Sequence, residues 1–377
     1  MFDTTGFWRD IILSVGILFI IYTLLKIFVF KRFKNKDRAK EVGLNIALVL
    51  GIMYLFLRIY ILIDFNLPDV IPAGNFMLSN ILNQTLQVSV LALATTGIVL
   101  IFKTSTTTNF AQGIIATFGA FVAAKLIQNF TLNYTEMSVT TAVVLSMIAA
   151  AITAFIIGIF VDSVIIRNSK DKTPVGKQMI TMGLVLVLSG AMPLIFGKIL
   201  LPIPKLSYAP NIQFTFLGAN LSITVHAFYA LIITVVLLTI LFTALRFTKW
   251  GLGVRATASN ELVASMMGVN TKIITAMSWA IAGFLGAVAA VLLTPNATNV
   301  SVGLMTPTQV NAFMAAILGS FSSFLGPLVA TVLIPVLTGL LSLVVPLWQN
   351  AVVYLIILAI VLVKPMGLFG KKVAKKV

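Results

Sequence analysis

Apolar runs of about 20 residues recur along the chain, and their length constrains its fold more than any other feature. A helix needs about 20 apolar residues to cross a bilayer, whereas the strands of a membrane β-barrel appear as alternating segments of about 10 residues, which are not visible here. Only 10% of the 377 residues are charged, and 59% are hydrophobic. Because a soluble domain carries about 25% charged residues, the sequence excludes a soluble globular enzyme. It predicts an all-α, polytopic membrane helical bundle.

The runs predict about eleven helical segments. They cover residues 11–30, 42–63, 79–102, 108–130, 138–165, 178–200, 224–245, 273–294, 308–320, 323–344 and 348–363. The segment 308–320 is too short for an ordinary crossing, so we expect a half-helix or a steep, broken span there.

Basic residues indicate the orientation of the spans. Most of the 26 Lys and Arg residues fall on one side of the predicted spans, in the loops 31–40, 167–177 and 246–272 and beyond residue 363. Loops rich in Lys and Arg stay in the cytoplasm. We therefore expect the N-terminus outside and the basic tail 371–377 in the cytoplasm. This distribution explains the net charge of +16 by contact with the lipid bilayer, without a nucleic acid partner.

The predicted interior of the membrane lacks the groups that several kinds of chemistry require. All ten acidic residues fall in loops or at span ends, which argues against proton coupling but leaves sodium coupling open. There is no Cys, and the single histidine, His226, is expected to be an interfacial or helix-packing residue rather than a metal ligand or a proton carrier. The H-E-x-x-H, G-x-S-x-G and G-x-x-x-x-G-K-[ST] patterns are missing. We expect no catalytic residue, metal or cofactor in this chain.

The loop 251–270 reads GLGVRATASNELVASMMGVN and joins two predicted spans on the basic side. Its apolar and small residues recur at helical spacing, at Ala256, Ser259, Val263, Met266 and Met267. Gly268 and Asn270 can end such a helix. Two readings stay open: a coupling helix that docks into a partner protein, or an amphipathic connector that rests on lipid headgroups.

Four short motifs occur in a fixed order. They are Asn109–Gly113 (NFAQG) with Gly119 and Ala120, Arg255–Ala258 (RATA) with Ala264 and Gly268–Asn270 (GVN), Asn311–Gly319 (NAFMAAILG), and Lys364–Gly370 (KPMGLFG). Together, over about 79–370, they resemble the permeases of branched-chain amino acid ABC importers, and among these the first member of the usual permease pair. Two stretches depart from that pattern. Residues 320–327, SFSSFLGP, replace the family's glycine-rich turn, and residues 1–78 form an extra transmembrane hairpin.

The resemblance implies a permease core at 79–370 that works with other subunits. These are two cytoplasmic ATPase subunits that use ATP and Mg²⁺, a second homologous permease, and an external substrate-binding protein. The complex is expected in a bacterial cell membrane. The ATPases are expected to contact 251–270, at Arg255, Ala258, Glu261, Ala264, Gly268 and Asn270. Arg255 and Glu261 can set the register of that contact by charge complementarity, although each is as readily a solvated charge.

Polar residues within the predicted spans are the candidates for a solute pathway. They are Gln84, Gln87, Asn109, Gln112, Thr308, Gln309 and Asn311. Asn109 and Gln112, three residues apart, are expected on one helix face. Thr306 is expected to cap the half-helix, whose N-terminal end can face a substrate carboxylate. The alternative is that these amides hold helices together.

These features favour a permease subunit of an ATP-driven importer, most simply for branched-chain or other hydrophobic amino acids. Urea or short amides, and nucleosides or sugars, remain open as substrates. An ATP-independent secondary transporter is the competing mechanism. A membrane-embedded enzyme is disfavoured by the missing motifs.

Overall fold

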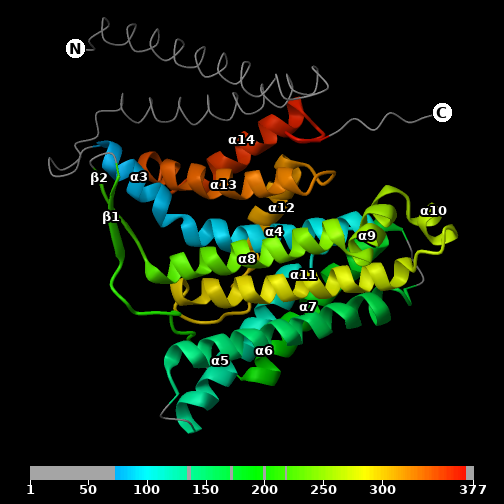
Figure 1. Cartoon of the computed structure of the whole chain (residues 1–377), viewed down its shortest axis with the longest axis horizontal. Coiled ribbons are helices and arrows are strands. Elements are labelled where there is room, and N and C mark those ends of the chain that lie inside the picture. Colours follow the sequence, from blue (N-terminus) through cyan, green and yellow to red (C-terminus); the bar gives the residue numbers. More distant parts are fainter. Residues whose placement is uncertain (1–72, 134–136, 170–172, 198–200, 217–218, 371–377) are drawn as a thin grey trace, which may run out of the picture. The chain divides into compact units, whose positions relative to one another are not determined.

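The computed structural model describes residues 73–133, 137–169, 173–197, 201–216 and 219–370 (Figure 1). The chain divides into two compact units, and the larger one contains residues 74–339 and 349–370 of the described part. Of the smaller unit, Ala73 and Leu340–Trp348 are described. The predicted helices 11–30 and 42–63, nearly all of the predicted hairpin 1–78 and the tail 371–377 lie outside the described residues.

Most described residues lie in helices. In chain order these are α3 (Ala73–Asn83), α4 (Thr85–Ser105), α5 (Gln112–Asn133), α6 (Val139–Phe160), the π-helical turn η2 (Val161–Ile166), α7 (Pro174–Phe196), α8 (Val225–Phe247), α9 (Lys249–Ser259), α10 (Glu261–Met266), α11 (Thr271–Leu293), the 3₁₀ turn η3 (Thr294–Asn296), α12 (Thr306–Gly319), α13 (Leu325–Val344) and α14 (Gln349–Val363). Two strands, β1 (Ile212–Phe216) and β2 (Ala219–Ile223), form an antiparallel hairpin in which Phe214 lies opposite Leu221. The prediction of a wholly helical chain missed this hairpin.

Seven described helical segments are long and apolar enough to cross a membrane, and they match seven of the predicted spans. They are Thr85–Ser105, Gln112–Phe130, Val139–Ile166, Pro174–Phe196, Val225–Phe247, Thr271–Asn296 and Leu325–Ser342. The helix α12 has 14 residues and is therefore about 21 Å long, shorter than the bilayer core of about 30 Å. This is the short helix expected at 308–320. The helix α14, with 15 residues, is also shorter than a full crossing, because Pro346 precedes it and Pro365 follows it.

Side chains that accept hydrogen bonds from the first turn set the starts of several helices. Ser138, Thr173 and Thr224 each accept a hydrogen bond from a backbone N–H three residues later, at 3.2, 3.1 and 3.3 Å. Such residues satisfy N–H groups that have no partner within the helix. At the other end of α7, Gly197 has a φ of +82°, a conformation that favours glycine. Local sequence thus fixes where these helices begin and end.

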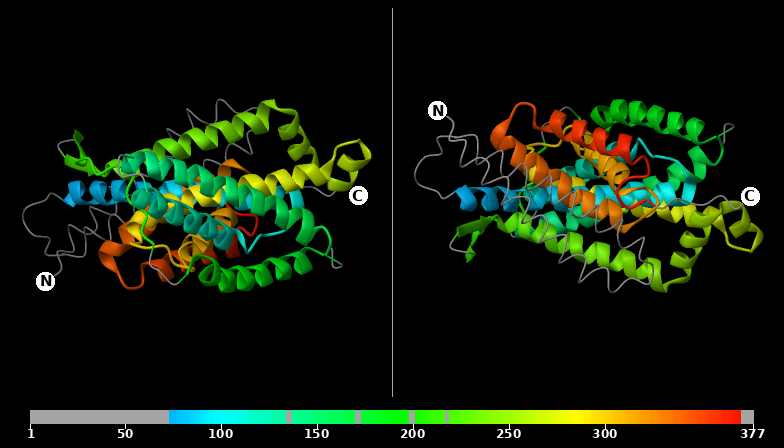
Figure 2. Two further views of the ribbon diagram at one scale, coloured as in Figure 1. Left: turned by 90° about the horizontal axis from the view of Figure 1, so that it is seen from below. Right: turned by 90° about the horizontal axis from the view of Figure 1, so that it is seen from above.

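The core of the larger unit is formed by α4, α5, α6 and α11, which lie side by side in Figures 1 and 2. Small residues let α6 and α11 approach closely. A Cβ added to Gly158 would lie 2.4 Å from the carbonyl oxygen of Trp279, and one added to Gly283 would lie 2.3 Å from that of Ala154. Both contacts are with backbone atoms, so the two helices pack closely at these glycines.

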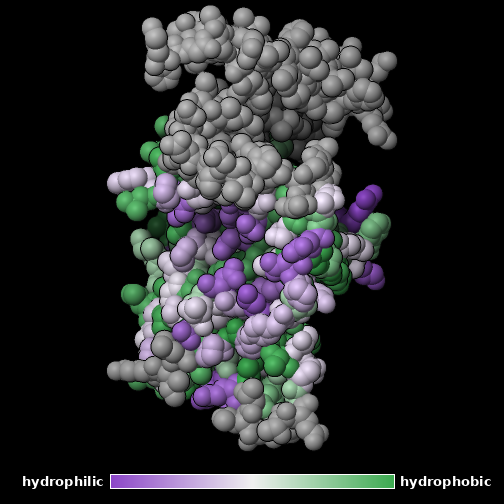
Figure 3. All heavy atoms as spheres, turned by 90° about the vertical axis from the view of Figure 1, so that its left-hand side faces the viewer, coloured by the Kyte–Doolittle hydropathy of each residue, from purple (hydrophilic) through white to green (hydrophobic). Residues whose placement is uncertain are grey.

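The two ends of the bundle differ in structure. The helices α9 and α10 stand at one end, and the β1–β2 hairpin stands at the other (Figures 1 and 2). Polar residues gather across the hairpin end, which Figure 3 shows face on. Residues 211–215 there are all exposed.

Candidate functional site

The loop predicted as one coupling helix forms two helices, α9 and α10. Asn260 separates them in an extended conformation, and its side chain accepts a hydrogen bond from Val263 N at 3.1 Å to begin α10. Gly268, with a φ of +84°, follows α10. Asn270 does not end the segment's helix, as had been predicted. It begins α11 instead, by accepting a hydrogen bond from Ile273 N at 3.2 Å.

The first of these helices, α9, is anchored to the bundle. Gly251, Gly253, Val254 and Thr257 are buried. Gly253 lies against α11, where an added Cβ would be 2.7 Å from Ile274 Cδ1. The guanidinium of Arg255 donates hydrogen bonds to the carbonyls of Leu245 and Arg246 at the end of α8. Arg255, predicted as a partner contact, therefore holds α9 against α8.

The second helix, α10, projects apolar side chains away from the bundle. Leu262, Val263, Met266 and Met267 are exposed by 65, 51, 74 and 80%, and we call them the α10 patch. Of the other predicted coupling residues, Ala258, Glu261 and Gly268 are exposed beside this patch, and Ala264 is buried beneath it. Clustered exposed apolar residues at a polar end of a protein mark interaction surfaces.

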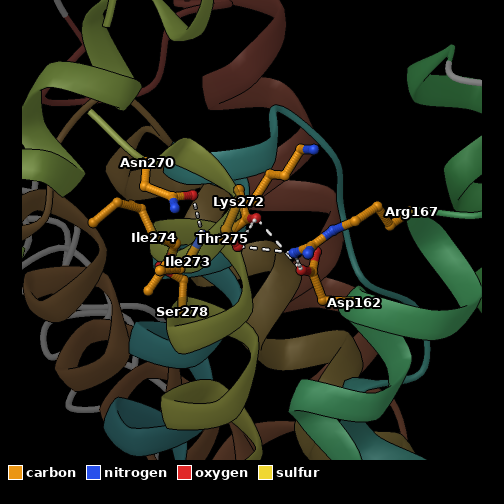
Figure 4. Close-up of polar contacts among 8 residues, drawn as sticks. All are labelled: Asp162, Arg167, Asn270, Lys272, Ile273, Ile274, Thr275 and Ser278. Carbon is orange, nitrogen blue, oxygen red and sulfur yellow. Dashed lines mark hydrogen bonds and ion pairs between the residues drawn. The ribbon is translucent and has the colours of Figure 1, made fainter. Parts of the chain in front are cut away.

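A polar contact joins the start of α11 to the end of α6 (Figure 4). Arg167 Nη2 lies 2.8 Å from Asp162 Oδ2 and donates a second hydrogen bond to the Lys272 carbonyl, also at 2.8 Å. Thr275 Oγ1 donates to Asp162 Oδ2 at 3.4 Å. The Asp162 side chain is only 6% exposed. The sequence placed Asp162 at a span end but predicted no partner for it.

Buried amides connect α5 to its neighbours. Gln309 of α12 accepts a hydrogen bond from Gly113 N at 2.6 Å and donates one to the Phe110 carbonyl at 2.5 Å. Both polar atoms of its amide therefore bind backbone groups at the start of α5, one within its first turn and one just before it. A Cβ on Gly113 would lie 2.2 Å from Gln309 Oε1, so a larger residue there would displace the Gln309 amide from this contact.

Two further predicted pathway residues extend this network. Asn109 lies before α5 rather than on its face, because α5 begins at Gln112, and it accepts a hydrogen bond from Ala111 N at 2.9 Å. The predicted pairing on one helix face is wrong in this respect. The two side chains nevertheless meet, with Asn109 Nδ2 donating to Gln112 Oε1 at 3.3 Å. Gln112 Nε2 in turn donates to the Ala282 carbonyl of α11 at 2.6 Å.

The remaining predicted pathway residues lie elsewhere. Gln84 separates α3 from α4 and packs over Gly339, whereas Gln87 is exposed. Thr308 is buried in α12, and Asn311 accepts a hydrogen bond from Tyr354 OH of α14 at 2.8 Å. The seven residues therefore do not form a single cluster.

The start of α12 differs from its prediction. Met305 occupies the N-cap position and makes no side-chain cap. Thr306 is the first helical residue, so its predicted capping role is wrong. Pro307 follows it in the first turn, where proline suits a helix because its missing N–H would have no helical partner.

A pocket of about 300 Å³ opens beside this turn, between α5, α7 and α12. It is lined by Phe110, Gly113, Ile114, Val185, Ser189, Val302, Gly303, Thr306, Gln309, Val310 and Phe313. None of these residues is charged. The hydroxyls of Ser189 and Thr306 make no hydrogen bond within the part of the chain that the structure describes. Such a pocket suits a small, largely apolar solute with a few polar groups.

The buried histidine has a structural position. Leu206 N donates to His226 Nδ1 at 3.2 Å, and His226 Nε2 lies 2.9 Å from the Leu292 carbonyl. These contacts fit a neutral ring that donates from Nε2 and joins the loop before β1 to the end of α11. They agree with the predicted packing role. The described residues contain no group of three or more His, Cys, Asp or Glu side chains that could hold a metal.

The sequence matches a family model described as a branched-chain amino acid transport system permease component, over residues 80–362. That range is more than half of the chain. The chain belongs to this permease family. It is therefore a transport protein and a component of an ABC system that contains further subunits. The motifs that resembled the family lie at the start of α5, along α9–α10, on α12 and after α14.

The chain also aligns with named relatives over nearly the full length of each relative. LivH of Salmonella typhimurium, a high-affinity branched-chain amino acid transport system permease protein, is 25% identical over 305 residues, which make up 80% of this chain and 98% of LivH. The corresponding BraD of Pseudomonas aeruginosa is 25% identical over 296 residues, 77% of this chain and 94% of BraD. A probable LivH from Methanocaldococcus jannaschii is 25% identical over 296 residues, 75% of this chain and 89% of the relative. No solved structure matches the chain.

These relatives and the seven apolar helices together support the predicted location as a multi-pass protein of the bacterial inner membrane.

Proposed function

We propose that this chain is the pathway-forming permease subunit of an ATP-driven ABC importer for branched-chain or other hydrophobic amino acids. The observation that carries the proposal is the α10 patch. It is exposed on a short helix, while the adjacent α9 is fixed to α8 and α11. A patch held this way can receive a push from a partner and pass it to the bundle.

The proposed partners are two cytoplasmic ATPase subunits, a second homologous permease and an external substrate-binding protein. ATP and Mg²⁺ are used by the ATPases, and this chain binds no cofactor of its own. The α10 end faces the cytoplasm, since the neighbouring loops are rich in Lys and Arg. The polar hairpin end faces outward, toward the binding protein. We propose this orientation together with about eleven spans and an N-terminus outside the cell.

The same reasoning assigns parts of the chain. Residues 79–370 form the permease core, with the coupling segment 251–270 inside it. The hairpin 1–78 is an addition to this core, and the tail 371–377 is cytoplasmic.

The solute pathway is proposed to run past the pocket beside α12. Its uncharged, mostly apolar lining suits an aliphatic side chain. Gln309 belongs to the lining, while Asn109 and Gln112 support it from behind through the amide network. Substrate carboxylate and ammonium groups would find hydroxyls at Ser189 and Thr306. The relatives' names supply the substrate class, branched-chain amino acids.

A cysteine cross-link tests the ATPase contact, because the chain contains no natural cysteine. We expect Met267→Cys, on the α10 patch, to cross-link in native membranes to a protein that mass spectrometry identifies as an ATPase subunit. The matched control is Ser222→Cys, which is exposed at the hairpin end. Cross-linking of the ATPase to residue 222 and not to residue 267 would contradict the proposed contact and its orientation.

A further inference from the structure

The contact between η2 and α11 lies where α10 rejoins the bundle. After α10 ends at Met266, Gly268 turns the chain and α11 begins at Thr271. The carbonyl of Lys272 and the hydroxyl of Thr275, both in the first turns of α11, are bonded to Arg167 and Asp162 at the η2 end of α6. Movement of α10 therefore reaches the bundle through a turn that α6 holds by polar contacts.

Asp162 and Arg167 face each other because η2 is a π-helical turn. Arg167 N donates to the Asp162 carbonyl, five residues earlier, at 3.0 Å. In an α-helix, residues three and four apart share a face, so residues five apart diverge. The wider turn brings the carboxylate and the guanidinium within 2.8 Å. Such turns interrupt α-helices frequently at functional sites.

Stability alone does not account for this ion pair. Gly158 and Gly283 already bring α6 and α11 into backbone contact within the membrane. The Asp162 side chain is 6% exposed and that of Arg167 is 35% exposed. An ion pair with one partner in contact with solvent adds little to stability. What the pair adds is a fixed register at one end of the two helices. A carboxylate is also favourable beside the first turn of α11, which has no acidic residue of its own.

The α10 patch thus lies between two sets of polar contacts, which we call anchors. On the α9 side, Arg255 binds the carbonyls at the end of α8. On the α11 side, Arg167 and Asp162 bind the first turns of α11. The first anchor is a set of hydrogen bonds to one helix end, whereas the second joins two spans of the core.

We propose that Asp162 and Arg167 are positioning residues that lock the start of α11 to α6, so that displacement of α10 moves both helices as one body. This inference rests on the proposed function, since it needs an ATPase that pushes on α10. Without the lock, α11 can yield at its first turn while α6 stays in place. ATP is then hydrolysed with less solute moved per cycle.

The test uses the complete transporter, purified with its partner subunits and reconstituted in lipid vesicles, with leucine uptake and ATP hydrolysis measured on the same vesicles. Asp162→Asn and Arg167→Gln each remove one charge. We expect both to keep the ATPase bound and hydrolysing, while leucine transported per ATP falls by about 2- to 30-fold, the range for residues that couple distant sites. The charge-swapped pair Asp162→Arg with Arg167→Asp is expected to recover part of this loss.

Lys272 provides the matched control. It contributes its backbone carbonyl to the contact, and its side chain points away from Arg167 in Figure 4. Lys272→Gln is therefore expected to keep the wild-type ratio. If a single variant fails to assemble, the double variant Asp162→Asn with Arg167→Gln removes both charges, so that neither is left without its partner. Assembled variants with an unchanged ratio would overturn the positioning role. Wild-type uptake without ATP would instead overturn the proposed function itself.

Discussion

Replacing Gly283 by Ala is expected to loosen the packing of α11 on α6. The added methyl would lie 2.3 Å from the Ala154 carbonyl oxygen, whereas non-bonded atoms prefer separations of about 3.5 Å or more. The helices must therefore separate by about 1 Å, because the contact is with backbone that no rotamer can move aside. Overpacking costs about 1–3 kcal/mol, and the gain in helix propensity returns about 1 kcal/mol. We expect a net loss of up to about 2 kcal/mol.

Gly190→Ala is the matched control for this prediction. Gly190 lies within α7, and nothing is within 4 Å of a Cβ added there. The same substitution should stabilise that helix by up to about 1 kcal/mol, because only propensity changes. Unfolding of the purified protein in mixed detergent micelles, titrated with a denaturing detergent, measures both values. Equal stability of the two variants would refute the close packing of α6 on α11 at Gly283.

Substitutions at three further positions test other features of the structure. Gln309→Leu leaves Gly113 N and the Phe110 carbonyl without their partner and should cost about 2–5 kcal/mol in the same titration, whereas a loss below about 0.5 kcal/mol would mean that the amide does not join α12 to α5. Ser320 has a φ of +81°, so Ser320→Gly should be more stable than Ser320→Ala by about 1 kcal/mol or more, and the reverse order would contradict the backbone strain. Met267→Ser should weaken ATPase retention in a pull-down several-fold without lowering thermal stability, because Met267 is 80% exposed; unaltered retention would remove it from the contact.

Much of the bundle could be predicted because apolar length alone specifies a membrane span. The seven predicted spans between 79 and 344 recur as long apolar helices. The β1–β2 hairpin was missed, although IQFTF and ANLSI alternate with the period of a strand, because five-residue strands give a weaker signal than apolar runs of membrane length. The break at Asn260 was also readable, since Asn favours the N-cap and Glu261 follows it in the first turn.

The side-chain contacts were harder to predict because they depend on tertiary geometry. Asp162 and Arg167 are five residues apart, and their side chains face each other because the helix forms a π-helical turn there. No pattern in the sequence predicted that turn. The polarity of Gln309 indicated that it needed a partner but did not indicate which one. In the structure both of its polar atoms bind the backbone around the start of α5, at Phe110 and Gly113. Gln309 therefore fits both predictions for these amides. It holds two helices together, and it also borders the pocket.

The most direct test of the proposed importer is leucine uptake by vesicles that contain this chain and the subunits that co-purify with it. We predict that uptake requires ATP in the compartment that the α10 end faces, and an amino acid-binding protein on the side of the hairpin end. We also predict that isoleucine and valine compete with leucine. Leucine uptake by this chain alone, at the same rate without ATP, would contradict an ATP-driven importer and favour a secondary transporter.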